Sequence, residues 1–224
     1  EAEEFAMGEY ASALLKGASL TPEERAVIVE KLSRYTGISQ EFIQRSDLRI
    51  LDRHYFKELL RERGKTVGRL DSRYTGIDRI GVTETYEYDP LFAQVSGPYT
   101  AAFNDYIRSE LKFETDLPYE ILSDKVWMNW SYGYFQNQYV NVAETLRSAM
   151  TFNKYLKVFV ANGYFDLGTP YFATEYTFDH LGLDASLRKN ISMGYYEAGH
   201  MMYVHMPSLK ALKKDLTKFI KDAS

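Results

Sequence analysis

Three side chains of the types used in nucleophilic catalysis occur in the second half of the chain: Ser131, Asp166 and His200. Ser131 lies in N-W-S-Y-G, one residue away from G-x-S-x-G, the strand–turn–helix sequence that can present a nucleophilic serine. Asp166 lies in F-D-L-G-T-P, and His200 lies in E-A-G-H-M. A serine can attack, a histidine can move its proton, and a carboxylate can orient the histidine. The three residue types, in this order, could therefore perform acyl transfer.

Asp166 and His200 each follow a short apolar segment that the sequence predicts to be a buried strand. These segments are L-K-V-F-V-A at 156–161 and I-S-M-G-Y-Y at 191–196. Catalytic groups of α/β sheets collect beyond the carboxyl ends of strands, and the A-G pair before His200 allows a sharp backbone turn. We therefore expect the carboxylate to meet the imidazole in one crevice and fix its tautomer. The alternative is an ordinary turn aspartate and a structural loop histidine.

The first half of the chain reads as helices and loops. T-P-E-E at 21–24 is a helix start, with a capping threonine, a proline at the first helical position and a capping-box glutamate. A second helix is predicted over 52–64. Residues 64–98 contain several glycines and few long apolar runs, which predicts mostly loop. Pro98 is then expected to open the next helix.

The second half alternates between helical and strand patterns. Helices are predicted over 140–150, with Asn141 and Glu144 at capping-box spacing, over 169–180, and from Pro207 onward. With the two strands between them, this order is typical of an α/β layer with parallel strands. Two strands make a poor parallel sheet, which needs neighbours on both sides. We therefore expect part of the sheet to come from outside this chain.

Composition limits the classes of function. The chain has 224 residues, enough for one large domain or two small ones, and 45% of them are hydrophobic. With 27 basic and 31 acidic residues the net charge is −4, which argues against a nucleic-acid binder. No stretch of about twenty apolar residues predicts a membrane span. The absence of cysteine excludes disulfides and thiolate metal sites.

A histidine metal site is also considered and set aside. His200 and His205 are five residues apart, one more than the spacing that places two imidazoles on one helix face. Glycine and proline interrupt the segment, and Glu197 is the only acidic residue close to them in the sequence. The sequence therefore predicts no bound metal and no cofactor.

At this point two longer segments carry a resemblance. K-V-F-V-A-N-G-Y-F-D-L-G-T-P and Y-Y-E-A-G-H-M, followed by a terminal amphipathic helix, resemble the C-terminal part of the serine carboxypeptidase family. V-G-R-L-D-S-R-Y-T-G at 67–76 and G-P-Y-T-A-A-F-N-D-Y at 97–106 resemble its bacterial branch. The similarity spans nearly the whole chain. It implies removal of C-terminal residues from peptides, with Asp166 and His200 as triad members, in a periplasmic or secreted enzyme.

The resemblance also implies a fold and a domain division. The fold would be α/β, the C-terminal portion of an α/β-hydrolase with parallel strands and flanking helices plus a largely helical lid. Residues 1–125 would form the lid region, and residues 126–224 the portion that carries the Asp and the His of the triad. The implied partners are a peptide substrate and the upstream half of the same enzyme, with no nucleic acid and no membrane.

The chain departs from the family at the nucleophile. The family's serine sits in a G-E-S-Y-G turn upstream of the lid, and its oxyanion hole depends on W-x-N-G-G-P-G; neither segment occurs here. Asn129 replaces the first glycine of the turn around Ser131, and Y-F-Q-N-Q-Y beyond it lacks a helical pattern. We expect Ser131 not to be the nucleophile, the serine to lie in the upstream half, and this chain alone to be inactive.

Two other functions remain open at this stage. One is a non-catalytic binding or scaffold module with the remnants of a hydrolase fold, and the other is a small hydrolase that uses Ser131. The substrate-binding residues are unknown. Trp127, Trp130 and Tyr132 could line a peptide cleft, although an aromatic core is the simpler interpretation for most of the 19 tyrosines.

Overall fold

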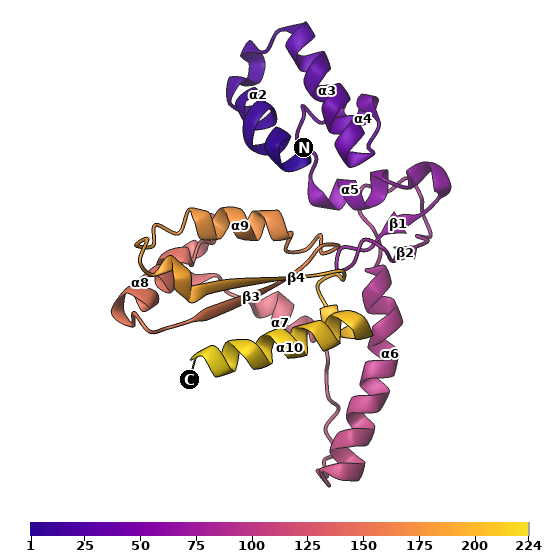
Figure 1. Ribbon diagram of the computed structural model, residues 1–224. Helices are drawn as coiled ribbons and strands as arrows, with labels where there is room; N and C mark the ends of the chain where they lie inside the picture. The colour runs from indigo at the N-terminus through magenta and orange to yellow at the C-terminus, as the bar shows by residue number, and fades with distance from the viewer. Residues whose placement is uncertain (224) are drawn as a thin grey trace.

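The computed structural model describes residues 1–223 and mixes helices with two small sheets, one parallel and one antiparallel (Figure 1). Five helices lead the chain, with a π-helical turn at Ala6–Tyr10 between the first two. The described chain contains no helix long and apolar enough to cross a membrane. The leading helices are α1 (Ala2–Phe5), α2 (Ala11–Lys16), α3 (Pro22–Thr36), α4 (Gln40–Arg45) and α5 (Asp52–Glu58).

The predicted helix start at 21–24 is confirmed in α3. The Thr21 hydroxyl accepts the Glu24 amide at 3.2 Å, and the Glu24 carboxylate accepts the Thr21 amide at 3.0 Å. Gly37, with φ of 76°, ends the helix in the left-handed region that favours glycine. The helices bury a common apolar cluster: Phe5, Ala13, Ile28, Val29, Leu32, Ile38, Ile43 and Leu48.

The helix predicted over 52–64 is shorter than expected. α5 spans Asp52–Glu58, and a 3₁₀ turn over Arg61–Arg63 continues to Gly64. Lys57 is buried on α5 and forms an ion pair with the buried Asp78. This pair ties α5 to the loop that follows the short antiparallel strands β1 (Thr66–Val67) and β2 (Thr75–Gly76).

The prediction that Pro98 opens a helix is wrong. Helix α6 (Pro90–Asp105) begins eight residues earlier, and Pro98 lies inside it. Asp89 accepts the Phe92 amide at 2.9 Å, so this aspartate and Pro90 form the capped start instead. A proline in a helix interior removes one backbone hydrogen bond, and this long helix tolerates that loss. Helix α7 (Asp124–Asn129) follows.

The capping box predicted between Asn141 and Glu144 is also wrong. Helix α8 (Ala143–Phe152) begins two residues after Asn141, whose side chain accepts the Ala143 amide at 2.9 Å in a local turn. Glu144 forms an ion pair with Arg147 on the helix surface instead. The helix predicted over 140–150 is present, but it begins three residues later and ends two residues later than expected.

The two predicted strands form the parallel sheet. β3 (Val158–Gly163) begins two residues later than expected, and β4 (Ile191–Tyr196) has the predicted bounds. They pair from Val158 with Ile191 to Gly163 with Tyr196. Helix α9 (Tyr171–Asp179) crosses between them, and α10 (Met206–Ala223) covers the opposite face (Figure 1). The second half of the chain therefore has a two-stranded parallel sheet with helices on its two faces, a mixed helix-and-strand arrangement compatible with the predicted α/β class.

The sheet is packed on both faces but by few residues. On one side Met150, Leu181 and Leu183 form a small buried cluster with Val158 and Ile191 against it. On the other, the rings of Phe159 and Phe219 lie 5.5 Å apart and join β3 to α10. Within residues 1–223, each strand has one edge that no other strand pairs.

Candidate active site

Asp166 and His200 lie at the same edge of the parallel sheet and contact each other. Asp166 follows the last residue of β3 by three positions, and His200 follows the last residue of β4 by four. Because the strands are parallel and in register, both loops leave the sheet at its carboxyl edge. The imidazole Nδ1 lies 2.9 Å from Oδ2 of Asp166. The structure thus brings together the two side chains that the sequence singled out.

Asp166 is held by the loop in which it lies. Its Oδ1 accepts the amides of Gly168 at 2.8 Å and Thr169 at 2.9 Å, and its Oδ2 accepts the Thr169 hydroxyl at 2.6 Å. The side chain is only 5% exposed. Burial by itself raises the pKa of this carboxyl, but the hydrogen bonds from Thr169, His200 and Gly168 outweigh burial and hold the pKa below its ordinary value. The group is therefore a fixed, ionised acceptor near neutral pH.

His200 combines a fixed inner nitrogen with an accessible outer one. Its side chain is 48% exposed, and among residues 1–223 no group hydrogen-bonds Nε2. A proton on Nδ1, donated to Asp166, leaves the Nε2 lone pair facing outward. The Thr169 hydroxyl lies 3.2 Å from the same Nδ1 and already donates to Asp166. Such an imidazole can accept a proton from a neighbouring hydroxyl and return it, as a general base and acid.

A third segment, residues 69–73, completes the surroundings of the pair and was missed by the sequence analysis. The Leu167 amide donates to the Arg69 carbonyl at 3.0 Å, and the Ser72 amide donates to the Phe165 carbonyl at 2.9 Å. The His200 amide donates to the carbonyl of Leu70 at 2.7 Å. The segment therefore bonds to the backbone of both loops. In the sequence this segment is marked only by R-L-D-S-R, which forms part of the family resemblance.

Ser131 does not join the pair. It lies between the end of α7 and a 3₁₀ turn at Gly133–Phe135. A helix and not a strand comes directly before it, so the strand–turn–helix geometry of a nucleophile turn is absent there. Its hydroxyl accepts the Gly133 amide at 3.2 Å. No hydrogen bond connects it with Asp166 or His200 in the part of the chain that the structure describes.

The two histidines considered for a metal site, His200 and His205, each have a different hydrogen-bond partner. His205 lies at the start of α10, where its Nδ1 is 2.8 Å from the hydroxyl of Ser208. No group of three or more His, Cys, Asp or Glu side chains suited to a metal ion occurs among residues 1–223.

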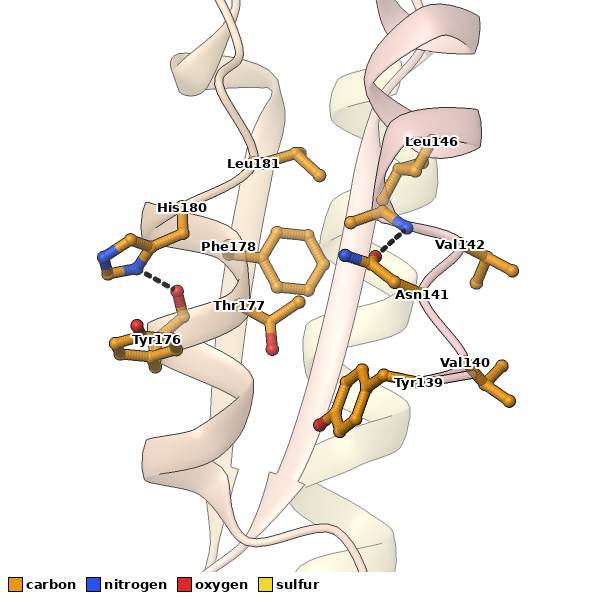
Figure 2. Close-up of a pocket in the computed structure, with 11 residues that line it drawn as sticks. Tyr139, Val140, Asn141, Val142, Leu146, Tyr176, Thr177, Phe178, His180 and Leu181 are labelled. Atoms are coloured by element: carbon orange, nitrogen blue, oxygen red, sulfur yellow. Dashed lines mark hydrogen bonds between the residues drawn. The ribbon is translucent and has the colours of Figure 1, made fainter. Parts of the chain in front are cut away.

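Several hollows lie outside the Asp166–His200 pair, and two of them are lined by residues that the sequence singled out. One, of about 460 Å³, separates α9 from the segment before α8, with Phe178 pointing between them (Figure 2). His180 borders it, but its ring stacks on Tyr176 at 3.9 Å and its Nδ1 lies 2.7 Å from the Tyr176 carbonyl oxygen. Neither Asp166 nor His200 lines this hollow.

Another hollow, of about 330 Å³, is lined by Val126, Trp127, Trp130 and Tyr132. These side chains are 56% to 71% exposed, so the aromatic-core interpretation does not apply to them. The two tryptophans instead form an accessible aromatic surface on α7 and just beyond it.

No protein-family model, curated protein or solved structure significantly matches the chain. The geometry of the Asp166–His200 pair and the sequence pattern therefore have to support any assignment of function. The pair is the one arrangement described above in which burial, hydrogen bonding and exposure all suit proton transfer.

Proposed function

We propose that this chain is the C-terminal part of a serine carboxypeptidase-like peptidase, in which the nucleophilic serine comes from the upstream half of the same enzyme. The observation that supports it most is the hydrogen bond between His200 and the buried Asp166 at the carboxyl edge of two parallel strands. The family resemblance supplies three parts of this proposal: the hydrolase fold, the peptide substrate, and the export of the enzyme to the periplasm or out of the cell.

The mechanism assigns one step to each atom of the pair. In the assembled enzyme Nε2 of His200 takes the proton of the serine hydroxyl as its oxygen attacks the carbonyl carbon of the last peptide bond. The same nitrogen then gives that proton to the departing amine as the bond to nitrogen breaks. Water repeats the cycle and releases the shortened peptide from the serine. Asp166 stays ionised throughout and stabilises the imidazolium that forms between the steps.

The unfinished sheet supports a contribution from the upstream half. A two-stranded parallel sheet is not stable by itself, because parallel sheets are normally buried on both faces and extended by neighbours. Each strand has an unpaired edge within residues 1–223, where strands from the upstream half would extend the sheet. The serine would then arrive from a strand of the same sheet, at the same carboxyl edge as His200.

The proposal makes a direct prediction about the isolated chain. Without a nucleophile turn or oxyanion donors it should release no C-terminal amino acid from a peptide, because those groups form and stabilise the tetrahedral intermediate. Fluorophosphonate labelling separates this proposal from a hydrolase that uses Ser131. The purified chain should remain unlabelled, and a label on Ser131 would contradict the proposal.

Co-expression with the upstream segment tests the proposal itself. The assembled protein should release C-terminal residues, and His200→Ala should lower kcat by about 10⁴-fold or more, as loss of a triad member does. His180→Ala is the matched control, since His180 is also exposed but is bonded to Tyr176. Peptide release that survives His200→Ala would overturn the role given to this histidine. Assembly without any activity would favour the binding-module alternative.

A further inference from the structure

Asp71 is a fully buried carboxylate that the proposed reaction does not use. It is 0% exposed, and its Oδ2 accepts the amide of Gly199, the residue before His200, at 2.9 Å. The Arg73 guanidinium binds both of its oxygens, through Nε to Oδ1 at 3.0 Å and through a terminal nitrogen to Oδ2 at 2.7 Å. A buried carboxylate needs such a partner, so the pair forms a unit.

Arg73 extends this unit to both loops of the Asp166–His200 pair. Its other terminal nitrogen donates to the carbonyl of Glu197 at 3.0 Å, three residues before His200. Its guanidinium lies over the ring of Phe165, the residue before Asp166, at 4.6 Å from the ring centre. One planar group thus contacts the histidine loop through a hydrogen bond and the aspartate loop through a cation–π contact.

The histidine loop is pressed closely against the segment that carries Asp71. A Cβ atom placed on Gly199 would lie 2.2 Å from the Leu70 carbonyl oxygen and 2.5 Å from the Asp71 Cβ. Only glycine fits there, although its φ is not in the left-handed region. The loop therefore has little room to shift while residues 70–71 stay in place.

We propose that Asp71 and Arg73 are positioning residues that hold the loop before His200, so that its Nδ1 stays within hydrogen-bond distance of Asp166. The inference rests on the proposed function, because it assigns the two residues to the geometry of the same proton-transfer pair. They contact the backbone at Gly199 and Glu197 and the ring of Phe165, so they would act through these neighbours and not on the reacting atoms. The Asp166 loop contacts the histidine loop as well, through the Phe165 amide and the Ala198 carbonyl at 3.0 Å. The Asp71–Arg73 unit adds a second restraint, on the backbone at Gly199 and Glu197.

The test measures the tautomer of His200 directly and needs no enzymatic activity. Long-range ¹H–¹⁵N correlation spectra of the whole chain, at a pH where the ring is neutral, give the ratio of the Nδ1–H form to the Nε2–H form. The Nδ1–H form should dominate in the unaltered chain. The two Asp71 oxygens accept one backbone amide each, that of Arg73 at 3.0 Å and that of Gly199 at 2.9 Å. Asp71→Asn keeps the shape but removes the charge and one acceptor oxygen, so one of these two amides loses its acceptor. The ratio should fall about tenfold, as expected for loss of a charged hydrogen bond.

Asp78→Asn is the matched control. Asp78 is also a buried carboxylate paired with a basic side chain, Lys57, and bonded to the hydroxyl of Thr66. Its replacement should lower the urea midpoint but leave the His200 tautomer ratio unchanged. An equal change of the ratio in both variants, or none in Asp71→Asn, would overturn the proposal.

Arg73→Lys is a second variant that tests the proposal if Asp71→Asn does not fold. Lysine retains the charge beside Asp71 but loses the fork that also reaches Glu197, so the tautomer ratio should fall to a value between those of the unaltered chain and Asp71→Asn. An unaltered ratio in Arg73→Lys would contradict a role for Arg73. In the co-expressed enzyme Asp71→Asn should lower kcat with KM unchanged. If the unaltered enzyme releases no peptide, the proposed function fails, while the tautomer shift still reports the positioning role.

Discussion

The helical region of residues 1–59 and the β3–β4 layer differ in how far their apolar side chains are buried within the described chain. The helices bury eight hydrophobic side chains to 7% exposure or less in one cluster, all from residues 5–48. In the β3–β4 layer the first three side chains of β3, Val158, Phe159 and Val160, are only half-buried. The two clusters of this layer have three buried members each. The first region finds its packing partners within the described chain, whereas the second is packed along only part of its surface.

The difference follows from the range of the contacts that each structure needs. Helices form their own backbone hydrogen bonds and need neighbours only along one apolar face. Strands take their hydrogen bonds from other strands, so a parallel sheet can be complete only when distant segments are present. The Asp166–His200 geometry is nevertheless formed, because it depends on only two adjacent strands and their loops.

The largest expected effect is the loss of a fully buried side chain from the helical region. Ile43 is 0% exposed. Ile43→Ala should lower the unfolding free energy of this region by about 2–5 kcal/mol, from lost burial and the cavity left behind. Val160→Ala on β3 should cost about 1 kcal/mol or less, since its side chain is only half-buried. Native-state amide exchange in α3 and β3 measures each region separately.

Leu15→Ala is the control for these two variants, because Leu15 is 89% exposed and its replacement should change stability by less than about 0.5 kcal/mol. Equal losses of unfolding free energy in Ile43→Ala and Val160→Ala would contradict the difference in packing between the two regions. With the upstream half bound, the loss in Val160→Ala should grow, since β3 would then be covered.

A substitution at Gly199, which follows strand β4, should have the next largest effect on the unfolding free energy. The added methyl group of Gly199→Ala would overlap the Leu70 carbonyl and Asp71, so the His200 loop must shift. The expected loss is about 1–3 kcal/mol, together with a weaker His200–Asp166 hydrogen bond. Gly81→Ala is the control, because open space surrounds Gly81. Urea unfolding followed by circular dichroism should show no comparable loss for the control.

Acid should reveal the contribution of Asp166. Its pKa in the folded chain lies below the value of about 3.9 in the unfolded chain, so its ionised form stabilises the fold fully above about pH 4. That stability is lost as the pH falls through the folded-state pKa. In Asp166→Asn the urea midpoint should therefore be lower near neutral pH and fall less steeply below about pH 4. If the urea midpoint falls equally steeply with pH in the unaltered chain and in Asp166→Asn, the hydrogen bonds to Asp166 do not lower its pKa as described.

Local patterns were sufficient to predict the Asp166–His200 contact. Apolar segments marked both strands, a single helix between them required a parallel crossover, and parallel strands bring their carboxyl-end loops together. The bounds of β4 and the position of α9 followed from the same signals. Each of these inferences needs information from only a few neighbouring residues.

The setting of that contact could not be predicted in the same way. Asp71 and Gly199 are separated by 128 positions in the sequence. The segment that carries Asp71 is held in place by hydrogen bonds to side chains and carbonyl groups of distant residues. Such contacts leave no periodic pattern of apolar residues in the sequence. Gly199 was explained as a residue that lets the backbone turn, whereas the structure requires glycine for the close approach of Leu70. The spacing of Asp71 and Arg73, two residues apart in a loop, was the available signal.

The smallest expected effect concerns the exposed tryptophans. Trp127 and Trp130 are the only tryptophans of the chain and are 71% and 64% exposed, so Trp127→Ser should change the unfolding free energy by less than about 0.5 kcal/mol. The fluorescence of the isolated chain should be that of water-exposed indoles and should be quenched by iodide. Binding of the upstream half should shift it to the blue and protect it if this aromatic surface belongs to the interface. Unchanged emission in an assembled, active enzyme would leave the surface open to solvent and available to the peptide substrate instead.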